Sequence, residues 1–259
     1  MKKIKSETKI LFDLVLGVLK SPFIFILALF GKRRFRDVFM PFKILFSSFF
    51  EPKFTVYLCF SLILVFFFSL FVSSNLLSYF LLYPEDIFSI RFFSLFTHGF
   101  LHANISHLFG NLVVIYVFGR IVESEFGFKK TALIYFFGLF FAGFFASLIN
   151  LYQGISIGSL GASGAAMALV SSAVFFRPFY FSYVFLVPLP AFFIGWMFVY
   201  SDILGVLSFS DSGIGYFAHL GGFLASVLFL FYFNRKEFFK GFFVNLVFLT
   251  LFYFSFIYY

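Results

Sequence analysis

Long apolar stretches separated by short polar connections divide this chain. A membrane-spanning helix needs about 20 predominantly apolar residues, within a range of about 17 to 25. Stretches of this length occur seven times and predict seven transmembrane helices. They cover residues 55–73, 105–122, 131–149, 160–176, 181–200, 215–233 and 242–259.

Residues 10–30 are also apolar, but Asp13 and Lys20 interrupt them. The Ser21-Pro22 pair is expected to break any helix there, which leaves two halves that are each too short to span. We therefore predict helices that lie at the cytoplasmic surface rather than a further span. The basic N-terminus is followed by no clear small-residue cleavage site, so no cleavable signal peptide is expected.

The composition strengthens the membrane assignment. The chain is 62% hydrophobic and only 12% charged, whereas soluble domains carry about 25% charged residues. We predict an all-α polytopic membrane protein with no nucleic-acid partner. A single cysteine, Cys59, excludes an intrachain disulfide and a cysteine-rich zinc site.

Basic residues alternate between connections and so indicate the orientation. They cluster at Lys2/Lys3/Lys5, Lys32/Arg33/Arg34/Arg36, Lys129/Lys130, Arg177 and Arg235/Lys236/Lys240. The other connections carry mostly acids, namely Glu85, Asp86, Asp202 and Asp211, with Arg91 as the exception. The positive-inside rule then predicts a cytoplasmic N-terminus, and a seventh span ends with the C-terminus outside.

Three polar groups interrupt the apolar stretches, where polar residues are costly and often functional. The first is Ser163 in the small-residue segment "GASGAAMAL", residues 161–169. Taken alone, such a segment is better explained by close helix packing, because small residues let membrane helices approach and a serine can hydrogen-bond to its own backbone.

The second group is "HGFLHANISHLFGN", residues 98–111, which holds His98, His102, His107 and Asn111. His107 and Asn111 are four residues apart and share one helix face. No acid accompanies these histidines and their spacing is not that of a zinc protease, so we predict no metal and no cofactor. Interhelical hydrogen bonds are the structural alternative.

The third group is "AHLGG" around His219, which matches Ser163 in depth. Ser163 lies 14 residues before Arg177 (177 − 163) and His219 lies 16 before Arg235 (235 − 219). At 1.5 Å per residue both sit roughly 21 to 24 Å from the cytoplasmic boundary. His219 could therefore act as base to a Ser163 nucleophile, with His107, Asn111 and backbone N–H groups as oxyanion donors. Asp202 and Asp211 are expected near the outer loop, which favours a Ser–His dyad without a carboxylate.

Taken together, "HANISHLFGN", "GASG" and "AHLGG" resemble the motifs of the rhomboid intramembrane serine proteases, in order and on the expected spans. The resemblance covers about residues 54–236 and implies a six-helix bundle as the catalytic core. Residues 1–53 would then be a basic cytoplasmic region, and residues 237–259 an additional C-terminal transmembrane helix.

The resemblance also implies a role for each matching residue. Ser163 would be the nucleophile and His219 the base, with His107, Asn111 and the Ser163 N–H as the oxyanion hole. Gly161, Gly164 and Gly222 would allow close packing of the helices. His102 would form hydrogen bonds in the first loop, where Arg91 would also lie. Glu123 would anchor the second span. Two positions depart from the family pattern: Ile90 replaces a tryptophan, and Met167 replaces an aromatic residue that stacks on the histidine.

The leading prediction is thus a serine protease that cuts other membrane proteins in or near their transmembrane segments, embedded among lipids in a bacterial inner membrane. The alternative is a rhomboid-like protein that binds membrane clients without cutting them, which Met167 keeps open. A transporter or channel would need charged residues at mid-depth or broken helices, and the spans show neither. The sequence predicts no oligomeric state.

Overall fold

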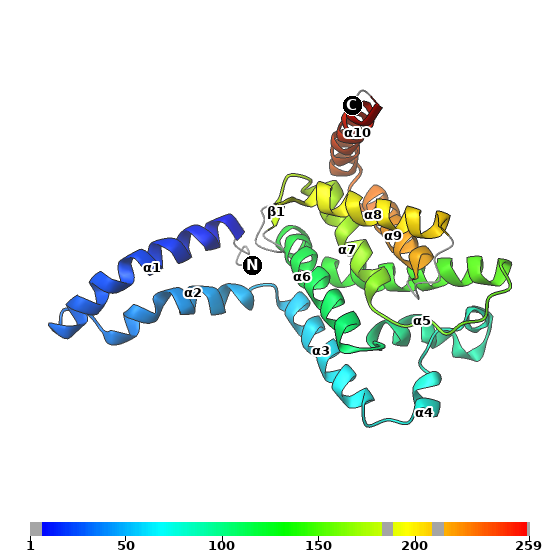
Figure 1. The fold of residues 1–259 in the computed structure, drawn as a ribbon, viewed down its shortest axis with the longest axis horizontal. Coiled ribbons are helices and arrows are strands. Elements are labelled where there is room, and N and C mark those ends of the chain that lie inside the picture. Colours follow the sequence, from blue (N-terminus) through cyan, green and yellow to red (C-terminus); the bar gives the residue numbers. More distant parts are fainter. Residues whose placement is uncertain (1–6, 183–188, 209–214, 258–259) are drawn as a thin grey trace.

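A computed structural model describes residues 7–182, 189–208 and 215–257 of the chain. The described residues are almost entirely helical (Figure 1). The α-helices are α1 (Glu7–Leu29), α2 (Met40–Phe49), α3 (Lys53–Ser69), α4 (Ser74–Ser78), α5 (Ser94–Thr97), α6 (Ile105–Tyr152), α7 (Ser163–Phe176), α8 (Ala191–Leu207), α9 (Tyr216–Phe233) and α10 (Arg235–Ile257). Short 3₁₀ helices are η1 (Phe35–Phe39), η2 (Pro84–Phe88), η3 (Ile90–Phe93) and η4 (His98–Phe100), and the antiparallel strand pair is β1 (Phe181–Ser182) and β2 (Leu189–Pro190).

The helix α7 forms the centre of the bundle. Every residue from Gly164 to Phe175 is buried, and α6, α8, α9 and α10 all pack against this helix. Its sequence is apolar or small on every face, as expected for a helix surrounded by others. The hydroxyls of Ser172 on α7 and Ser226 on α9 are 2.6 Å apart in this interior, so each satisfies the other's hydrogen-bonding need.

The long element α6 consists of two helices joined at Gly127. This glycine has a φ of 73° and a ψ of 172°, which is not helical. The halves on either side contain the predicted stretches 105–122 and 131–149, and Figure 1 shows them running in different directions. Residues with a Cβ rarely adopt positive φ, so Gly127 allows this break.

Each of the seven predicted stretches contains a helix, although in 181–200 the helix begins only at Ala191, and the all-α polytopic architecture is confirmed. Three helices are long and apolar enough to cross a membrane among the described residues: Lys9–Leu29, Ile105–Tyr152 and Tyr216–Phe233. The helices Phe35–Phe49 and Lys53–Ser69 are bent by 82° relative to each other and would be a fourth if they form one span. Ser163–Phe176 and Ala191–Leu207 are shorter apolar helices.

The prediction of a helix break at Ser21-Pro22 is wrong. The helix α1 continues through Pro22 for 23 residues. Ser21 Oγ donates to the carbonyls of Gly17, at 2.8 Å, and Val38, at 3.1 Å. Pro22 lacks the N–H that would bond the carbonyl of Val18, and the helix continues past this gap. In Figure 1, α1 and α2 lie side by side as a helical hairpin that extends away from the bundle.

The boundaries predicted for the fifth span are also wrong. The stretch 181–200 was expected to be helical, but α8 runs from Ala191 to Leu207 and follows the strand pair β1–β2. Pro190 is its N-cap, with extended backbone angles. Because proline fits the start of a helix far better than its interior, the helix begins after Pro190. Asp202 therefore lies inside a helix, whereas Asp211 falls outside the described residues.

The C-terminal helix α10 is fastened to the bundle by Asn245. Asn245 Oδ1 accepts a hydrogen bond from Trp196 Nε1 of α8 at 2.8 Å, and its Nδ2 donates to the Val174 carbonyl of α7 at 3.0 Å. Gly241 packs directly on the backbone of Phe175. These contacts provide the packing partners of the last helix, which the sequence did not indicate.

Candidate functional site

Ser163 is the first residue of the central helix α7, where backbone donors are free. The first N–H groups of any helix lack an intrahelical acceptor, and the first helical bond here runs from the N–H of Ala166 to the carbonyl of Ala162 at 2.9 Å. The helix dipole adds positive potential at this end. A negative oxygen next to Ser163 would therefore meet oriented donors.

The residue before the N-cap, Gly161, shapes the approach to Ser163. Its φ of 119° lies in the region that favours glycine. Its N–H donates to the carbonyl of His98 at 3.0 Å, which joins the segment before α6 to the serine segment. A Cβ on Gly161 would lie only 2.8 Å from Nε2 of His107, so a side chain here would displace that ring.

His107 and Asn111 lie on the first turns of α6. Asn104 caps this helix by accepting a hydrogen bond from the His107 N–H at 2.8 Å. The amide nitrogen of Asn111 would be 3.9 Å from a Cβ on Gly161. That nitrogen is buried, and no described residue accepts a hydrogen bond from it. A buried donor without an acceptor is unusual in a folded protein, and this one lies beside Gly161, which is two residues before Ser163 in the chain.

His219 belongs to the first turn of α9, which packs tightly against α7. Gly222 of α9 contacts the carbonyl of Gly164 directly, and a Cβ on Gly164 would lie 3.3 Å from the carbonyl of Ala218. These small residues bring the neighbours of Ser163 and His219 into contact. Gly161, two residues before Ser163, in turn lies against the ring of His107. The structure thus gathers Ser163, His219, His107 and Asn111 at one end of α7.

No hydrogen bond joins Ser163 Oγ to His219 within the part of the chain that the structure describes. Instead, His219 Nδ1 lies 2.9 Å from Oδ1 of Asp202 on α8. The prediction that no carboxylate accompanies the histidine is therefore wrong. It failed because the span was placed too early, which put Asp202 in a loop. Pro190 could have corrected the start of that helix from sequence alone.

The hydrogen-bonding role predicted for His102 is also not observed. Both ring nitrogens are buried without a hydrogen-bond partner among the described residues, although the ring lies near the backbone of Phe100. It packs edge-on against His107, with ring centroids 5.1 Å apart. Burial lowers the pKa of His102 to about 4, so this ring is neutral at physiological pH.

The loop residue Arg91 is surrounded by backbone carbonyls. Its Nη2 donates to the carbonyl of Ser78 at 3.0 Å, with those of Tyr79 and Leu81 at 3.3 Å. Its Nε lies 3.4 Å from Asp86 Oδ1. Ile90, which stands at the departing position beside it, is 95% exposed. Arg91 thus organises the segment between α3 and α6.

Glu123 and Met167 both lie inside the bundle. The buried carboxylate of Glu123 accepts from the backbone N–H groups of Phe54, at 2.9 Å, and Thr55, at 3.0 Å, and from the Thr55 hydroxyl. It therefore caps the N-terminus of α3. Met167 is buried one turn beyond Ser163 and belongs to the apolar core.

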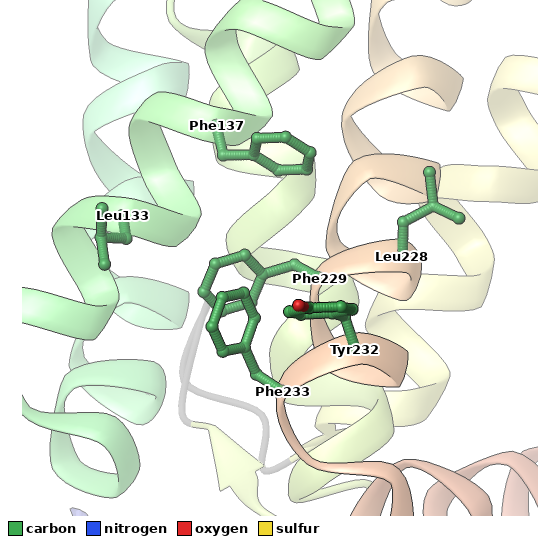
Figure 2. Close-up of a pocket in the computed structure, with 6 residues that line it drawn as sticks. All are labelled: Leu133, Phe137, Leu228, Phe229, Tyr232 and Phe233. Carbon is green, nitrogen blue, oxygen red and sulfur yellow. The ribbon is translucent and has the colours of Figure 1, made fainter.

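An apolar groove lies away from these residues. Its volume is about 370 Å³, and six side chains of α6 and α9 line it: Leu133, Phe137, Leu228, Phe229, Tyr232 and Phe233 (Figure 2). Leu228 is nine residues beyond His219 (228 − 219), or about 13 Å along the helix. Among the described residues, no group of three His, Cys, Asp or Glu side chains could hold a metal ion.

The fold and the polar cluster define a polytopic integral membrane protein that gathers serine, histidine and asparagine side chains at one end of its central helix. Residues 89–236, more than half of the chain, match the Rhomboid domain. The chain belongs to the rhomboid family.

Two plant proteins of Arabidopsis thaliana are similar in sequence. RHOMBOID-like protein 12, mitochondrial, is 29% identical over 158 residues, which cover 55% of this chain and 47% of that protein. RHOMBOID-like protein 1 is 31% identical over 152 residues, covering 55% and 37% respectively. The chain thus aligns with less than half of each relative.

Proposed function

We propose that this protein is an intramembrane serine protease that hydrolyses peptide bonds in or near the transmembrane segments of other membrane proteins. The packing of Gly164 against α9 carries the proposal, because it brings the chain neighbours of Ser163 and His219 into contact. Membership of the rhomboid family supports the same class of activity.

In the proposed reaction, His219 Nε2 removes the proton of Ser163 Oγ as this oxygen attacks the substrate carbonyl carbon. The resulting oxyanion receives hydrogen bonds from His107, Asn111 and the N–H of Ser163. The carbon–nitrogen bond then breaks, and His219 returns its proton to the leaving amine. Water, deprotonated by His219, hydrolyses the acyl-enzyme and restores the serine.

The missing Ser163–His219 hydrogen bond is compatible with this reaction. Hydrogen bonds between catalytic groups are often long or poorly aligned without substrate and tighten in the complex. A substrate helix must also unwind locally, because its scissile carbonyl is otherwise engaged in its own helical hydrogen bonds. We therefore expect substrates with helix-destabilising residues near the cleaved bond.

Placement in the membrane is part of the proposal. The alternation of basic connections supports a cytoplasmic N-terminus and an outer C-terminus. The bacterial inner membrane stays a prediction, and the two relatives described above are plant proteins.

The test is labelling of detergent-solubilised protein with a fluorophosphonate, which reacts with activated serines. Wild type is expected to label, and Ser163→Ala and His219→Ala are expected not to. Ser171→Ala is the matched control, because this hydroxyl lies buried on the same helix, without a hydrogen-bond partner in the described structure. A folded wild type that does not label would favour binding of membrane clients without cleavage.

A further inference from the structure

We propose that Asp202 is a positioning residue that holds His219 with its Nδ1 protonated and its Nε2 free to accept the serine proton. This inference rests on the proposed protease function. It extends the dyad predicted from the sequence to a chain of three side chains from α7, α9 and α8.

The contact has the geometry of a charge-assisted hydrogen bond. Nδ1 of His219 and Oδ1 of Asp202 are 2.9 Å apart, and the aspartate side chain is only 7% exposed. An ionised carboxylate can only accept hydrogen bonds. Its partner nitrogen must therefore carry the proton, and in a neutral ring the other nitrogen, Nε2, is then the acceptor.

A second contact fixes the register of α8 against α9. Gly205 packs directly on the ring of Tyr216. Gly205 lies three residues after Asp202, and Tyr216 lies three residues before His219. Residues three apart share a helix face, so the two contacts stack along the same seam. The seam therefore sets the position of Asp202 relative to His219.

Folding alone does not explain a carboxylate at this position. The second oxygen, Oδ2, is buried and accepts no hydrogen bond from the described residues. Buried polar atoms are nearly always paired, and an acid inside an apolar membrane helix is expensive. Positioning of a catalytic imidazole accounts for its presence, as it would at other serine-protease sites built on a Ser-His-Asp arrangement.

The experiment compares Asp202→Asn with wild type in the full-length protein. Asparagine keeps the size of the side chain but can donate to Nδ1, which would leave Nε2 protonated and unable to act as base. We expect the rate of fluorophosphonate labelling to fall by about 10²- to 10⁴-fold, with detergent-solubilised protein still monodisperse. Ser201→Ala, on the adjacent exposed position of α8, is the matched control and should label like wild type.

The second readout is the tautomer of His219, measured from ¹⁵N spectra of histidine-labelled protein near neutral pH. The chain has four histidines, and His219→Gln assigns the relevant signal. We expect the Nδ1-protonated form in wild type, retained in Asp202→Glu and lost in Asp202→Asn. An Nε2-protonated ring in wild type would overturn the inference, even if Asp202→Asn does not fold.

The two readouts separate the two proposals. The positioning role would be overturned if wild type labels and Asp202→Asn labels at the same rate with the same His219 tautomer. The protease proposal would then still stand. Wild type that does not label would overturn the protease, while the tautomer would still report whether Asp202 orients the ring.

Discussion

Asn111 contributes a buried amide donor beside the N-terminus of α7. Its Nδ2 has no acceptor among the described residues, which suits a group whose partner forms only during reaction. In the proposed reaction, such a donor would stabilise the transition state more than the bound substrate.

We expect Asn111→Ala to lower kcat by about 10²- to 10³-fold while KM changes little. Cleavage of a model transmembrane substrate in detergent or vesicles measures both constants. Asn75→Ala, at an exposed position of α4, should behave as wild type. A rise in KM with unchanged kcat would instead assign Asn111 to substrate binding.

Gly161 combines positive φ with a close approach to His107. Gly161→Ala should lose activity, because the new methyl group would lie within 2.8 Å of the imidazole. The backbone strain should also lower the free energy of unfolding by about 1 to 3 kcal/mol.

Gly154→Ala is the control for that strain. Gly154 has a φ of 69° with nothing within 4 Å of an added Cβ. It should lose stability but keep labelling, so equal labelling loss in both variants would argue against a specific effect on His107.

At the scale of elements, α6 and α3 are joined by a carboxylate cap. Glu123 on α6 satisfies two N–H groups at the start of α3, where the helix dipole also favours negative charge. The bond thus fixes where α3 and α6 meet.

Glu123→Gln should lower the free energy of unfolding by about 1.5 to 3 kcal/mol, the range for hydrogen bonds to charged groups. Unfolding in mixed micelles with increasing denaturing detergent would measure this loss. The nearby Glu125→Gln removes a more exposed ion pair with Arg177, 2.7 Å long, and should cost only about 0 to 1 kcal/mol. Equal losses would show that Glu123 acts as an ordinary surface charge.

At the scale of the whole molecule, the orientation decides from which side the site is reached. Ser163 and His219 lie near the ends of α7 and α9 that are far from Arg177 and Arg235. If basic ends face the cytoplasm, water and substrate reach the site from the outer face.

We expect a reporter enzyme that is active only outside to be active when fused after Tyr259, and inactive when fused before Met1. A fluorescent protein that matures only in the cytoplasm should give the opposite pattern. The N-terminal fusion decides the question, because α1 is long enough to span the membrane. If both termini lie on one side, the number of crossings is even. Either α1 then crosses the membrane or α10 does not.

The apolar stretches, the small-residue motifs and the histidines were enough to determine an all-α membrane protein of the rhomboid family. These features are local, since hydrophobic length and residue spacing are properties of single segments. Ser163, His219, His107 and Asn111 could be nominated because each is a polar residue in a predicted apolar stretch, at a similar predicted depth.

Contacts between segments required the tertiary structure. The bond between Asp202 and His219 joins two helices whose register depends on where α8 begins and on how Gly205 packs against Tyr216. The packing of α1 on the segment that follows it includes a bond from Ser21 to Val38, 17 residues away. The attachment of α10 depends on Asn245 reaching α7 and α8. Each outcome is set by which side chains meet across helices, and hydrophobic periodicity along one segment does not encode that meeting.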